Sequence, residues 1–191
     1  MNSPSSSAVS SVRVLSDVIP GDRARDLALV VGFALAIAAS AQVAIPLPGT
    51  PVPVTGQTFA VLLGGIVLGS GRATAGALAY LAAGVAGVPW FAVTGGATIG
   101  YIVGFVAAAA LLGRLAERGR ARGPLQVAAV MVVGNLVIYA FGVTGLALVT
   151  GMGASAAIAA GLVPFLIGDA LKLALAVVIV PAAWALVERE R

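Results

Sequence analysis

The chain contains no cysteine and no histidine among its 191 residues. Without cysteine it forms no disulfide bond and offers no thiolate nucleophile. Without histidine it lacks the commonest general base and the commonest metal ligand. These two absences remove most metal-dependent and histidine-dependent enzyme mechanisms. The sequence therefore predicts a protein that is not an enzyme, with no catalytic residues, no metal site and no bound cofactor.

Charged residues are also scarce, at 9% of the chain against about 25% in a typical soluble domain. Hydrophobic residues make up 60% of the sequence and gather in long runs. Runs of about 20 apolar residues are long enough to cross a bilayer as helices. The chain is therefore predicted to be an integral membrane protein in contact with the lipid bilayer, without a soluble domain. The net charge of +4 comes from arginines flanking the runs, so no nucleic-acid partner is expected.

Basic residues alternate strictly among the gaps that separate the apolar runs. Arginines lie before the first run, between the second and third, between the fourth and fifth, and after the last, whereas the other gaps have none. Loops rich in lysine and arginine stay cytoplasmic. The pattern predicts an all-α polytopic membrane protein, a compact bundle of six transmembrane helices with both termini in the cytoplasm. The predicted spans are Leu27–Ile45, Thr58–Leu68, Ala73–Val88, Thr98–Gly113, Leu125–Leu148 and Pro164–Val187.

The boundaries of this bundle follow from two further features. Residues 1–26 are polar and serine-rich, which predicts a flexible cytoplasmic N-terminal segment before a transmembrane domain over residues 27–188. Ala39-Ser40-Ala41 resembles a signal-peptide cleavage site, but cleavage would leave only five spans, so an uncleaved first helix is expected. The second span is short enough to suggest a re-entrant segment instead. Burying Arg72 at the tip of such a segment would be costly, which favours two short helices.

The first connection, Pro46 to Gln57, has four prolines in eight positions. Proline forbids a regular helix and favours a stiff, extended backbone. The segment is either an ordinary connector or a preshaped cap. Because a connector needs few residues, a cap over a pocket open to the extracellular side is at least as well supported.

Asp169 and Lys172 are the only ionisable side chains well inside a predicted span. Each costs about 2.5–3.5 kcal/mol at the bilayer centre on insertion scales. At positions i and i+3 they share one helix face and can partly neutralise each other. The pair has two interpretations of about equal weight, a structural ion pair that fixes the last helix and part of a ligand site.

Other polar and aromatic residues favour the ligand site, because they gather in the outer half of the bundle. Asn135 lies in the middle of the fifth span, with Tyr139 one turn further out. The remaining candidates are Gln57, Tyr80, Trp90 and Tyr101. A bowl with one anion, one cation, amides and aromatic rings suits a small, partly apolar molecule that carries a carboxylate. Lys172 would meet the carboxylate, while Asp169, Asn135 and Gln57 would satisfy ring N–H groups.

Small residues recur at four-residue spacing on two predicted helices. Gly96, Gly100 and Gly104 do so at the start of the fourth, where packing inside the bundle is the expected role. Ala34 and Ala38 do so in the first helix. Small faces let helix backbones approach closely in a membrane. The alanine face could therefore pack inside the bundle or meet another protein.

Several motifs, taken in their order along the chain, resemble those of the BioY family, the biotin-specific substrate-binding subunits of energy-coupling factor transporters. The motifs are Val52-Pro53-Val54-Thr55-Gly56-Gln57-Thr58, Leu68-Gly69, Tyr80-Leu81-Ala82-Ala83-Gly84-Val85-Ala86-Gly87-Val88-Pro89, Gly100-Tyr101-Ile102-Val103-Gly104-Phe105, Gly161-Leu162-Val163-Pro164-Phe165 and Asp169-x-x-Lys172. The resemblance covers nearly all of the chain from Leu27 to Lys172.

This resemblance implies a subunit for vitamin uptake in a bacterial plasma membrane. It implies biotin as the ligand, with Asp169 and Lys172 as the best-matched binding pair and Tyr80 and Gln57 next. It also implies partners, a transmembrane coupling subunit and two ATP-binding cassette ATPases. The coupling subunit would meet the small face of the first helix at Ala34 and Ala38.

Three alternatives compete with this assignment. The first is a subunit of the same architecture for another small vitamin, although a lysine in the bowl argues against cationic thiamine. The second is a stand-alone or ion-coupled carrier of biotin, in which Asp169 titrates during transport. The third is an intramembrane enzyme with Asp169 as its base, which the lack of histidine, cysteine and an acidic cluster disfavours.

Overall fold

The computed structural model describes residues 13–91 and 96–189. Helices make up almost all of this part of the chain, which confirms the all-α prediction. The elements are η1 (Leu15–Val18), α1 (Arg23–Gln42), β1 (Ala44–Ile45), β2 (Val54–Thr55), α2 (Gln57–Leu68), α3 (Ser70–Val85), η2 (Gly96–Thr98), α4 (Ile99–Glu117), α5 (Pro124–Thr150), α6 (Ala154–Gly161), η3 (Val163–Phe165) and α7 (Leu166–Arg189).

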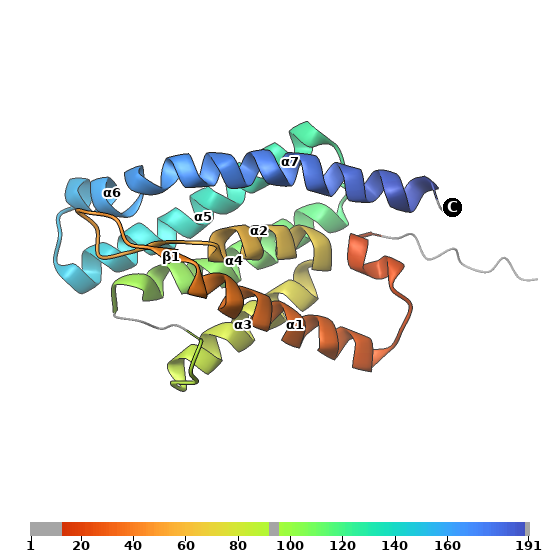
Figure 1. The fold of residues 1–191 in the computed structure, drawn as a ribbon, viewed down its shortest axis with the longest axis horizontal. Helices are drawn as coiled ribbons and strands as arrows, with labels where there is room; N and C mark the ends of the chain where they lie inside the picture. The colour runs from red at the N-terminus through yellow and green to blue at the C-terminus, as the bar shows by residue number, and fades with distance from the viewer. Residues whose placement is uncertain (1–12, 92–95, 190–191) are drawn as a thin grey trace, which may run out of the picture.

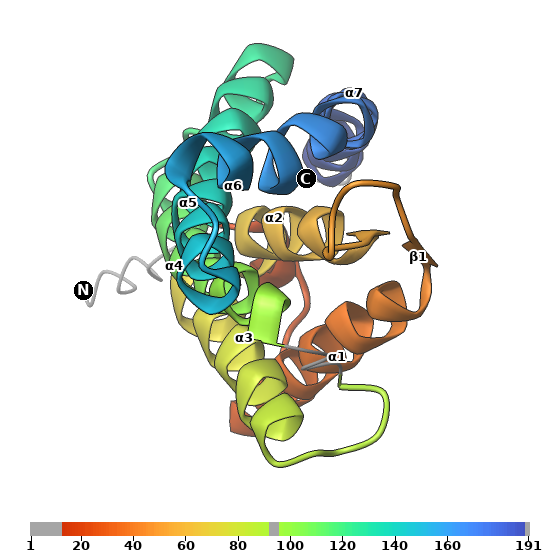
Figure 2. The ribbon, with the colours of Figure 1, turned by 90° about the vertical axis from the view of Figure 1, so that its left-hand side faces the viewer.

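The helices form a bundle in which α2 lies at the centre. It contacts α1, α3, α4, α5 and α7, and an end-on view shows these helices around it (Figure 2). The helix is almost entirely apolar, and none of its residues is in the exposed class. The central position explains why a helix of only 12 residues is stable in this fold.

The two ends of the bundle differ in the segments that they carry. The α2–α3 junction, the α4–α5 connection, η1 and the end of α7 lie together at one end (Figure 1). The β1–β2 loop, α6 and the start of α4 lie at the other end. All described arginines belong to the first group of segments or the helix ends beside them. The alternation of basic and neutral gaps in the sequence therefore corresponds to two chemically different ends of one bundle.

Four helical segments are long and apolar enough to cross a membrane. They are Arg23–Gln42, Gly96–Glu117, Pro124–Thr150 and Ala154–Arg189. The other two predicted spans correspond to α2 and α3, which have 12 and 16 residues and fall short of the usual length of about 20. Both are separate helices, and the chain turns back between them at Gly69.

The boundaries of the first predicted span were wrong at both ends. Helix α1 begins at Arg23, four residues early, because the Asp22 carboxylate caps it by accepting a hydrogen bond of 2.9 Å from the Ala24 amide. The helix ends at Gln42 rather than Ile45. Residues Ala44 and Ile45 instead pair antiparallel with Thr55 and Val54. This short ladder closes the proline-rich loop into a hairpin that returns the chain to the start of α2.

Residues 13–26 also differ from the flexible segment that was predicted, whereas residues 1–12 lie outside the described residues. Val14 and Ser16 are buried, and η1 packs against α2 and α7. Arg72 fixes this segment to α3: its Nη1 lies 2.8 Å from Asp17 Oδ1 and 2.9 Å from Ser16 Oγ, and its Nε lies 3.0 Å from Asp26 Oδ1. Burial alone would raise the pKa of Asp17, but hydrogen bonds from Arg72 and nearby amides outweigh it and lower that pKa.

Helices α4 and α5 pack closely against each other through glycine. A Cβ added at Gly100 would lie 2.6 Å from the Phe141 carbonyl oxygen and 2.9 Å from Gly145 Cα. At Gly104 it would lie 3.1 Å from the backbone of Ile138. Gly100 and Gly104 therefore pack inside the bundle, as the sequence suggested, whereas Gly96 is exposed and lies in η2 before the helix.

Helix α6 was not predicted, because it lies in the gap between the fifth and sixth predicted spans. Gly151, in the left-handed region at φ 72°, ends α5, and the alanine-rich stretch Ala154–Gly161 then forms two turns of helix. Pro164 lies in the 3-10 turn η3, which separates α6 from α7. Helix α7 therefore begins at Leu166, so Asp169 lies in its first turn.

Candidate functional site

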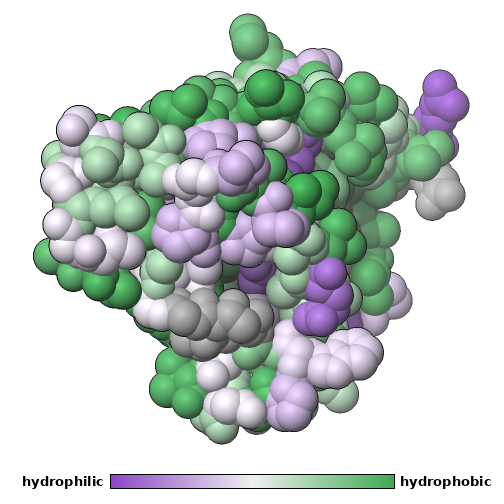
Figure 3. All heavy atoms as spheres, turned by 60° about the vertical axis from the view of Figure 1, so that its left-hand side comes forward, coloured by the Kyte–Doolittle hydropathy of each residue, from purple (hydrophilic) through white to green (hydrophobic). Residues whose placement is uncertain are grey.

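One cavity of about 320 Å³ opens at the end of the bundle that carries the β1–β2 loop. Polar residues gather around a hollow at this end, beside strongly hydrophobic surfaces (Figure 3). The volume of the cavity is at the lower end of the range of small-molecule sites, about 300–1,000 Å³. The lining residues are Ala41, Gln42, Ala44, Val52, Pro53, Thr55, Gln57, Thr58, Thr98, Tyr101, Ile102, Phe105, Asn135, Ile138, Tyr139, Phe165, Asp169 and Lys172.

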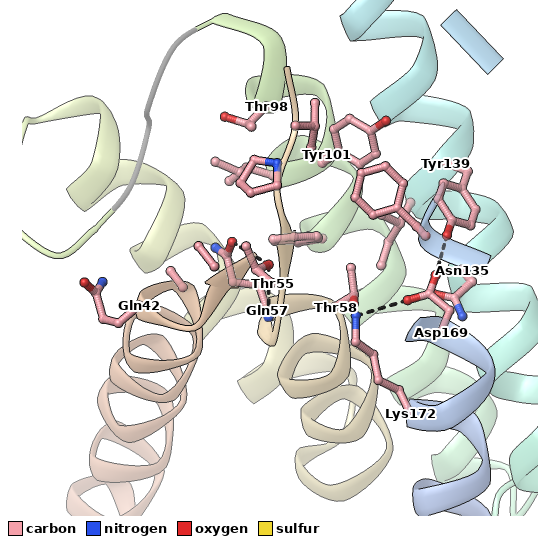
Figure 4. A pocket seen from close by; sticks show the side chains of 18 residues that line it. Gln42, Thr55, Gln57, Thr58, Thr98, Tyr101, Asn135, Tyr139, Asp169 and Lys172 are labelled. Carbon is pink, nitrogen blue, oxygen red and sulfur yellow. Dashed lines mark hydrogen bonds and ion pairs between the residues drawn. The ribbon is translucent and has the colours of Figure 1, made fainter. Parts of the chain in front are cut away.

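Asp169 and Lys172 form an ion pair on the α7 side of this cavity (Figure 4). Lys172 Nζ lies 3.1 Å from Asp169 Oδ1, and the two side chains are 18% and 9% exposed. Nζ also donates a 2.7 Å hydrogen bond to Thr58 Oγ1 at the start of α2. Asp169 lies in the first turn of α7, where the helix dipole favours a negative charge. The pair predicted from its i, i+3 spacing therefore exists and faces the cavity.

Helix α5 supplies the second contact to the carboxylate. The Tyr139 hydroxyl donates a short hydrogen bond to Asp169 Oδ2, and Tyr139 is buried. Asn135, one turn earlier on α5, also lines the cavity and lies close to Asp169 in Figure 4. Both carboxylate oxygens of Asp169 thus accept a hydrogen bond, one from a cation and one from a neutral hydroxyl.

A second polar group lies where the hairpin meets α2. Thr55 Oγ1 and Gln57 Oε1 lie 3.1 Å apart, and Gln57 Nε2 donates a 2.7 Å hydrogen bond to the Tyr80 hydroxyl. Gln57 lines the cavity, but Tyr80 does not. Tyr80 is almost fully buried on α3, and its hydroxyl holds the Gln57 amide in place through this hydrogen bond. Of the predicted site residues, Tyr80 is therefore placed to support the site and not to line it.

The wall between these polar groups is apolar. It comes mainly from Tyr101, Ile102 and Phe105 of α4 together with Phe165 of η3. The Tyr101 hydroxyl donates a 2.6 Å hydrogen bond to the Gly161 carbonyl oxygen, and its ring centroid lies 6.3 Å from that of Phe165. Because the hydroxyl is occupied by the backbone of α6, Tyr101 offers its ring to the cavity.

Trp90 is the predicted site residue that the structure keeps away from the cavity. Its side chain is 72% exposed and does not line the cavity, and its backbone has φ 79°. Only its carbonyl oxygen approaches the site residues, by accepting a 3.2 Å hydrogen bond from Gln42 Nε2. Its expected place in the bowl was wrong in this structure, because the turn after α3 directs the side chain outward.

The expected partner face at Ala34 and Ala38 is also corrected. These residues are 5% and 3% exposed and belong to the hydrophobic core. They face α2 and α3, the two helices that α1 contacts most. Of the two roles that the alanine spacing allowed, the structure shows packing inside the bundle. A partner cannot reach this pair without displacing α1.

Thr58 was missing from the predicted site, whereas Tyr139 was noted only as the neighbour of Asn135, without a role; both contact the ion pair. The position of Tyr139 one turn after Asn135 was the signal for it. Thr58 carried no such signal, because its pairing with Lys172 joins segments 114 residues apart. In the described part of the chain, no three His, Cys, Asp or Glu side chains come together in a way that could hold a metal ion.

Comparison with known proteins places this chain in a family. The model of the BioY family matches residues 7–189. A biotin transporter BioY of Rhizobium etli is 34% identical over 167 residues, which cover 80% of this chain and 89% of the relative. A biotin transporter BioY of Thermotoga maritima is 36% identical over 154 residues, which cover 77% and 88%.

A solved structure shows the same fold. It is the crystal structure of the S-component for biotin from an ECF-type ABC transporter, with a TM-score of 0.74 and 22% sequence identity. The similarity covers 84% of this chain and 90% of that one. The match of the family model over nearly the whole chain shows that this protein belongs to the BioY family.

Proposed function

We propose that this protein binds biotin in the cavity between α2, α4, α5 and α7, as the substrate-binding subunit of a vitamin-uptake system. One observation carries the proposal: in a chain of the BioY family, a largely buried ion pair lies beside an aromatic wall in a cavity of small-molecule size. Among the lining residues, the formal charges of Asp169 and Lys172 cancel. The cavity therefore suits a ligand that has both a carboxylate and hydrogen-bond donors.

Biotin has the groups that these side chains would recognise. Lys172 would meet its carboxylate, exchanging the hydroxyl of Thr58 for a charged oxygen. Asp169, Asn135 and Gln57 would accept from or donate to the ureido ring. The rings of Tyr101, Phe105 and Phe165 would cover the sulfur-containing ring and the alkyl chain. Thiamine, being cationic, would place its charge beside Lys172, which disfavours it.

The orientation in the membrane completes the proposal. The arginine-bearing end would face the cytoplasm, with both termini inside, and the cavity would open outward. Six helices would then cross the membrane, and α2 and α3 would do so as two short helices shielded by their neighbours. The distribution of arginines between the two ends supports this orientation.

Release of biotin inside would require a partner, for which we propose a transmembrane coupling subunit with two ATPases in a bacterial plasma membrane. Ala28, Gly32 and Ala36 form an exposed small face on α1 that could receive such a subunit. We expect Ala36→Trp to leave biotin binding intact and to abolish ATP-driven uptake. Uptake in cells with and without the coupling proteins measures this, and uptake that persists without them would favour a stand-alone carrier instead.

The decisive experiment is titration calorimetry of biotin into the purified protein, with Asp169→Asn and the control Glu188→Gln. Both substitutions turn a carboxylate into an amide on α7, but Glu188 is exposed at the opposite end. We expect the wild type and Glu188→Gln to bind equally and Asp169→Asn to bind at least about tenfold more weakly, since hydrogen bonds to a charged group contribute about 1.5–3 kcal/mol. A folded wild-type sample that does not bind biotin would overturn the proposal.

A further inference from the structure

A second hollow lies far from the biotin cavity, at the arginine-bearing end of the bundle. It is a groove between the C-terminal turn of α4 and the first turns of α5, lined by Leu115, Arg120, Gln126, Ala129, Val130 and Val133. It shares no residue with the biotin cavity. The groove is therefore a separate feature that the proposed vitamin site does not explain.

The walls of the groove are apolar and open onto a surface that faces outward. Val130 is buried at 4% exposure, whereas Val133 on the next turn of α5 is 38% exposed. Beside them on α5, Leu125, Val132 and Leu136 are exposed. Because α5 is long and apolar enough to cross a membrane, it would present this exposed face to lipid hydrocarbon. An acyl chain is thus available at the open side of the groove.

The end of the groove that lies nearest the α4–α5 connection is cationic. Residues 114–122 contain four arginines and one glutamate, a net charge of +3. The carboxylate of Glu117 is engaged by α3, because its Oε1 accepts hydrogen bonds from the amide and the hydroxyl of Ser70, at 2.6 and 2.9 Å. The guanidinium groups of Arg114, Arg118 and Arg120 have no hydrogen-bond or ion-pair partner in the described part of the chain. Arg120 is the one of these three that lines the groove.

Gln126 adds hydrogen-bond donors at the same place. Its Oε1 accepts from the backbone amides of Arg122 and Gly123, both at 3.2 Å. With the oxygen occupied, the remaining amide N–H groups can only donate to a ligand. Arg120 and Gln126 therefore offer donors and positive charge together, which matches a phosphate group.

We propose that this groove binds an acidic phospholipid, with one acyl chain along Leu115, Val130 and Val133 and the phosphate at Arg120 and Gln126. Charge favours an acidic lipid over a zwitterionic one, since a choline or ethanolamine headgroup would bring its own cation against the arginine cluster. A soluble phosphate would gain the charge but would leave the apolar walls uncovered. The combination of walls and charge thus selects the lipid.

The test is native mass spectrometry of the protein in detergent with added phosphatidylglycerol or phosphatidylcholine. Arg120→Gln is compared with Arg118→Gln, which removes the same charge two residues away but outside the groove. Val133→Trp, which fills the groove without changing charge, is compared with Val132→Trp, an exposed neighbour that does not line it. Thermal unfolding and size-exclusion profiles report whether each variant is folded.

We expect phosphatidylglycerol to bind the wild type more tightly than phosphatidylcholine. We expect Arg120→Gln to weaken phosphatidylglycerol binding by about fivefold or more, since one arginine near a membrane surface changes binding by about this factor. Val133→Trp should also weaken it, because the indole fills the place of the acyl chain. The two control variants should leave this binding nearly unchanged. Equal losses in Arg118→Gln and Arg120→Gln would mean diffuse attraction and overturn the proposal. So would unchanged lipid binding in Arg120→Gln with impaired uptake, which would assign the groove to a protein partner.

Discussion

The two ends of this bundle both use ion pairs, but they use them in different ways. At the arginine-bearing end, Arg72 joins two aspartates and a serine from segments that precede it by 46 to 56 residues. At the cavity end, Asp169 and Lys172 are three residues apart on one helix and are otherwise held by the hydroxyls of Tyr139 and Thr58. The first network joins the segment before α1 and the start of α1 to α3. The second leaves two charges beside an open cavity, where neutral partners can be exchanged for a ligand.

This difference predicts that charge removal at the two ends has opposite consequences for binding and stability. Removing Lys172 should weaken ligand binding strongly and spare the fold, whereas removing Arg72 should destabilise the fold and leave ligand binding unchanged. The four tests below follow in order of expected effect.

The largest effect is expected for Lys172→Gln. It removes the cation that would meet the ligand's carboxylate, and a charge-assisted contact of this kind contributes about 1.5–3 kcal/mol, which corresponds to a loss of roughly 10- to 150-fold in affinity. Calorimetry with biotin measures it, and Arg118→Gln serves as the charge-matched control at the other end. Unchanged affinity with a marked fall in melting temperature would mean that the pair is only structural.

Tyr139→Phe should have the next largest effect, about a tenfold loss of biotin affinity. The hydroxyl fixes one carboxylate oxygen of Asp169, and without it the carboxylate would reorient in the empty cavity. Tyr101→Phe is the matched control, because its hydroxyl bonds to the Gly161 carbonyl oxygen and its ring alone faces the cavity. Equal losses in both variants would show that hydroxyl removal acts through general packing.

Arg72→Gln should lower the melting temperature by roughly 2–4 °C, the shift that a change of about 1 kcal/mol causes in a protein of this size. The effect is modest because the partners Asp17 and Asp26 are partly exposed, so solvent screens the pairs. Biotin affinity should stay within error of the wild type. A loss of binding here would show that the two ends are coupled.

The smallest effect is a dependence of stability on acid pH that comes from Asp17. Its pKa in the folded protein lies below the ordinary value of 3.8, so its contribution to stability is complete above that value and is lost as the pH falls through the folded pKa. Melting temperatures of the wild type should therefore fall in this acid range more steeply than those of Asp17→Asn. Parallel curves would contradict the assignment.

The long elements of the fold could be predicted from the sequence, because long apolar runs and flanking arginines report directly on membrane helices. The short elements could not. The β1–β2 ladder consists of two residue pairs, and α6 is an alanine-rich stretch that looks the same in a loop or in a helix. Both depend on contacts with other segments that no pattern within the element itself encodes.

The candidate site divides in the same way. Asp169, Lys172 and Asn135 could be found because a polar group inside an apolar span is conspicuous. The role of Ala34 and Ala38 could not be decided from the sequence, because small residues occur all around α1, at Ala28, Gly32, Ala34, Ala36 and Ala38 among others, so spacing alone does not show which side is buried. Trp90 was misplaced because its left-handed backbone, rare for a bulky residue, reverses the direction in which its side chain points.

The glycine contact between α4 and α5 has a mechanical consequence for the cavity. With the backbones of Gly100 and Gly145 in direct contact, these two helices have no side-chain layer between them that could yield, so their wall of the cavity is stiff. The opposite wall, residues 44–55, is closed by two residue pairs. We expect the time that a ligand stays bound to depend on how often this hairpin wall gives way, while the stiff wall determines which ligand fits.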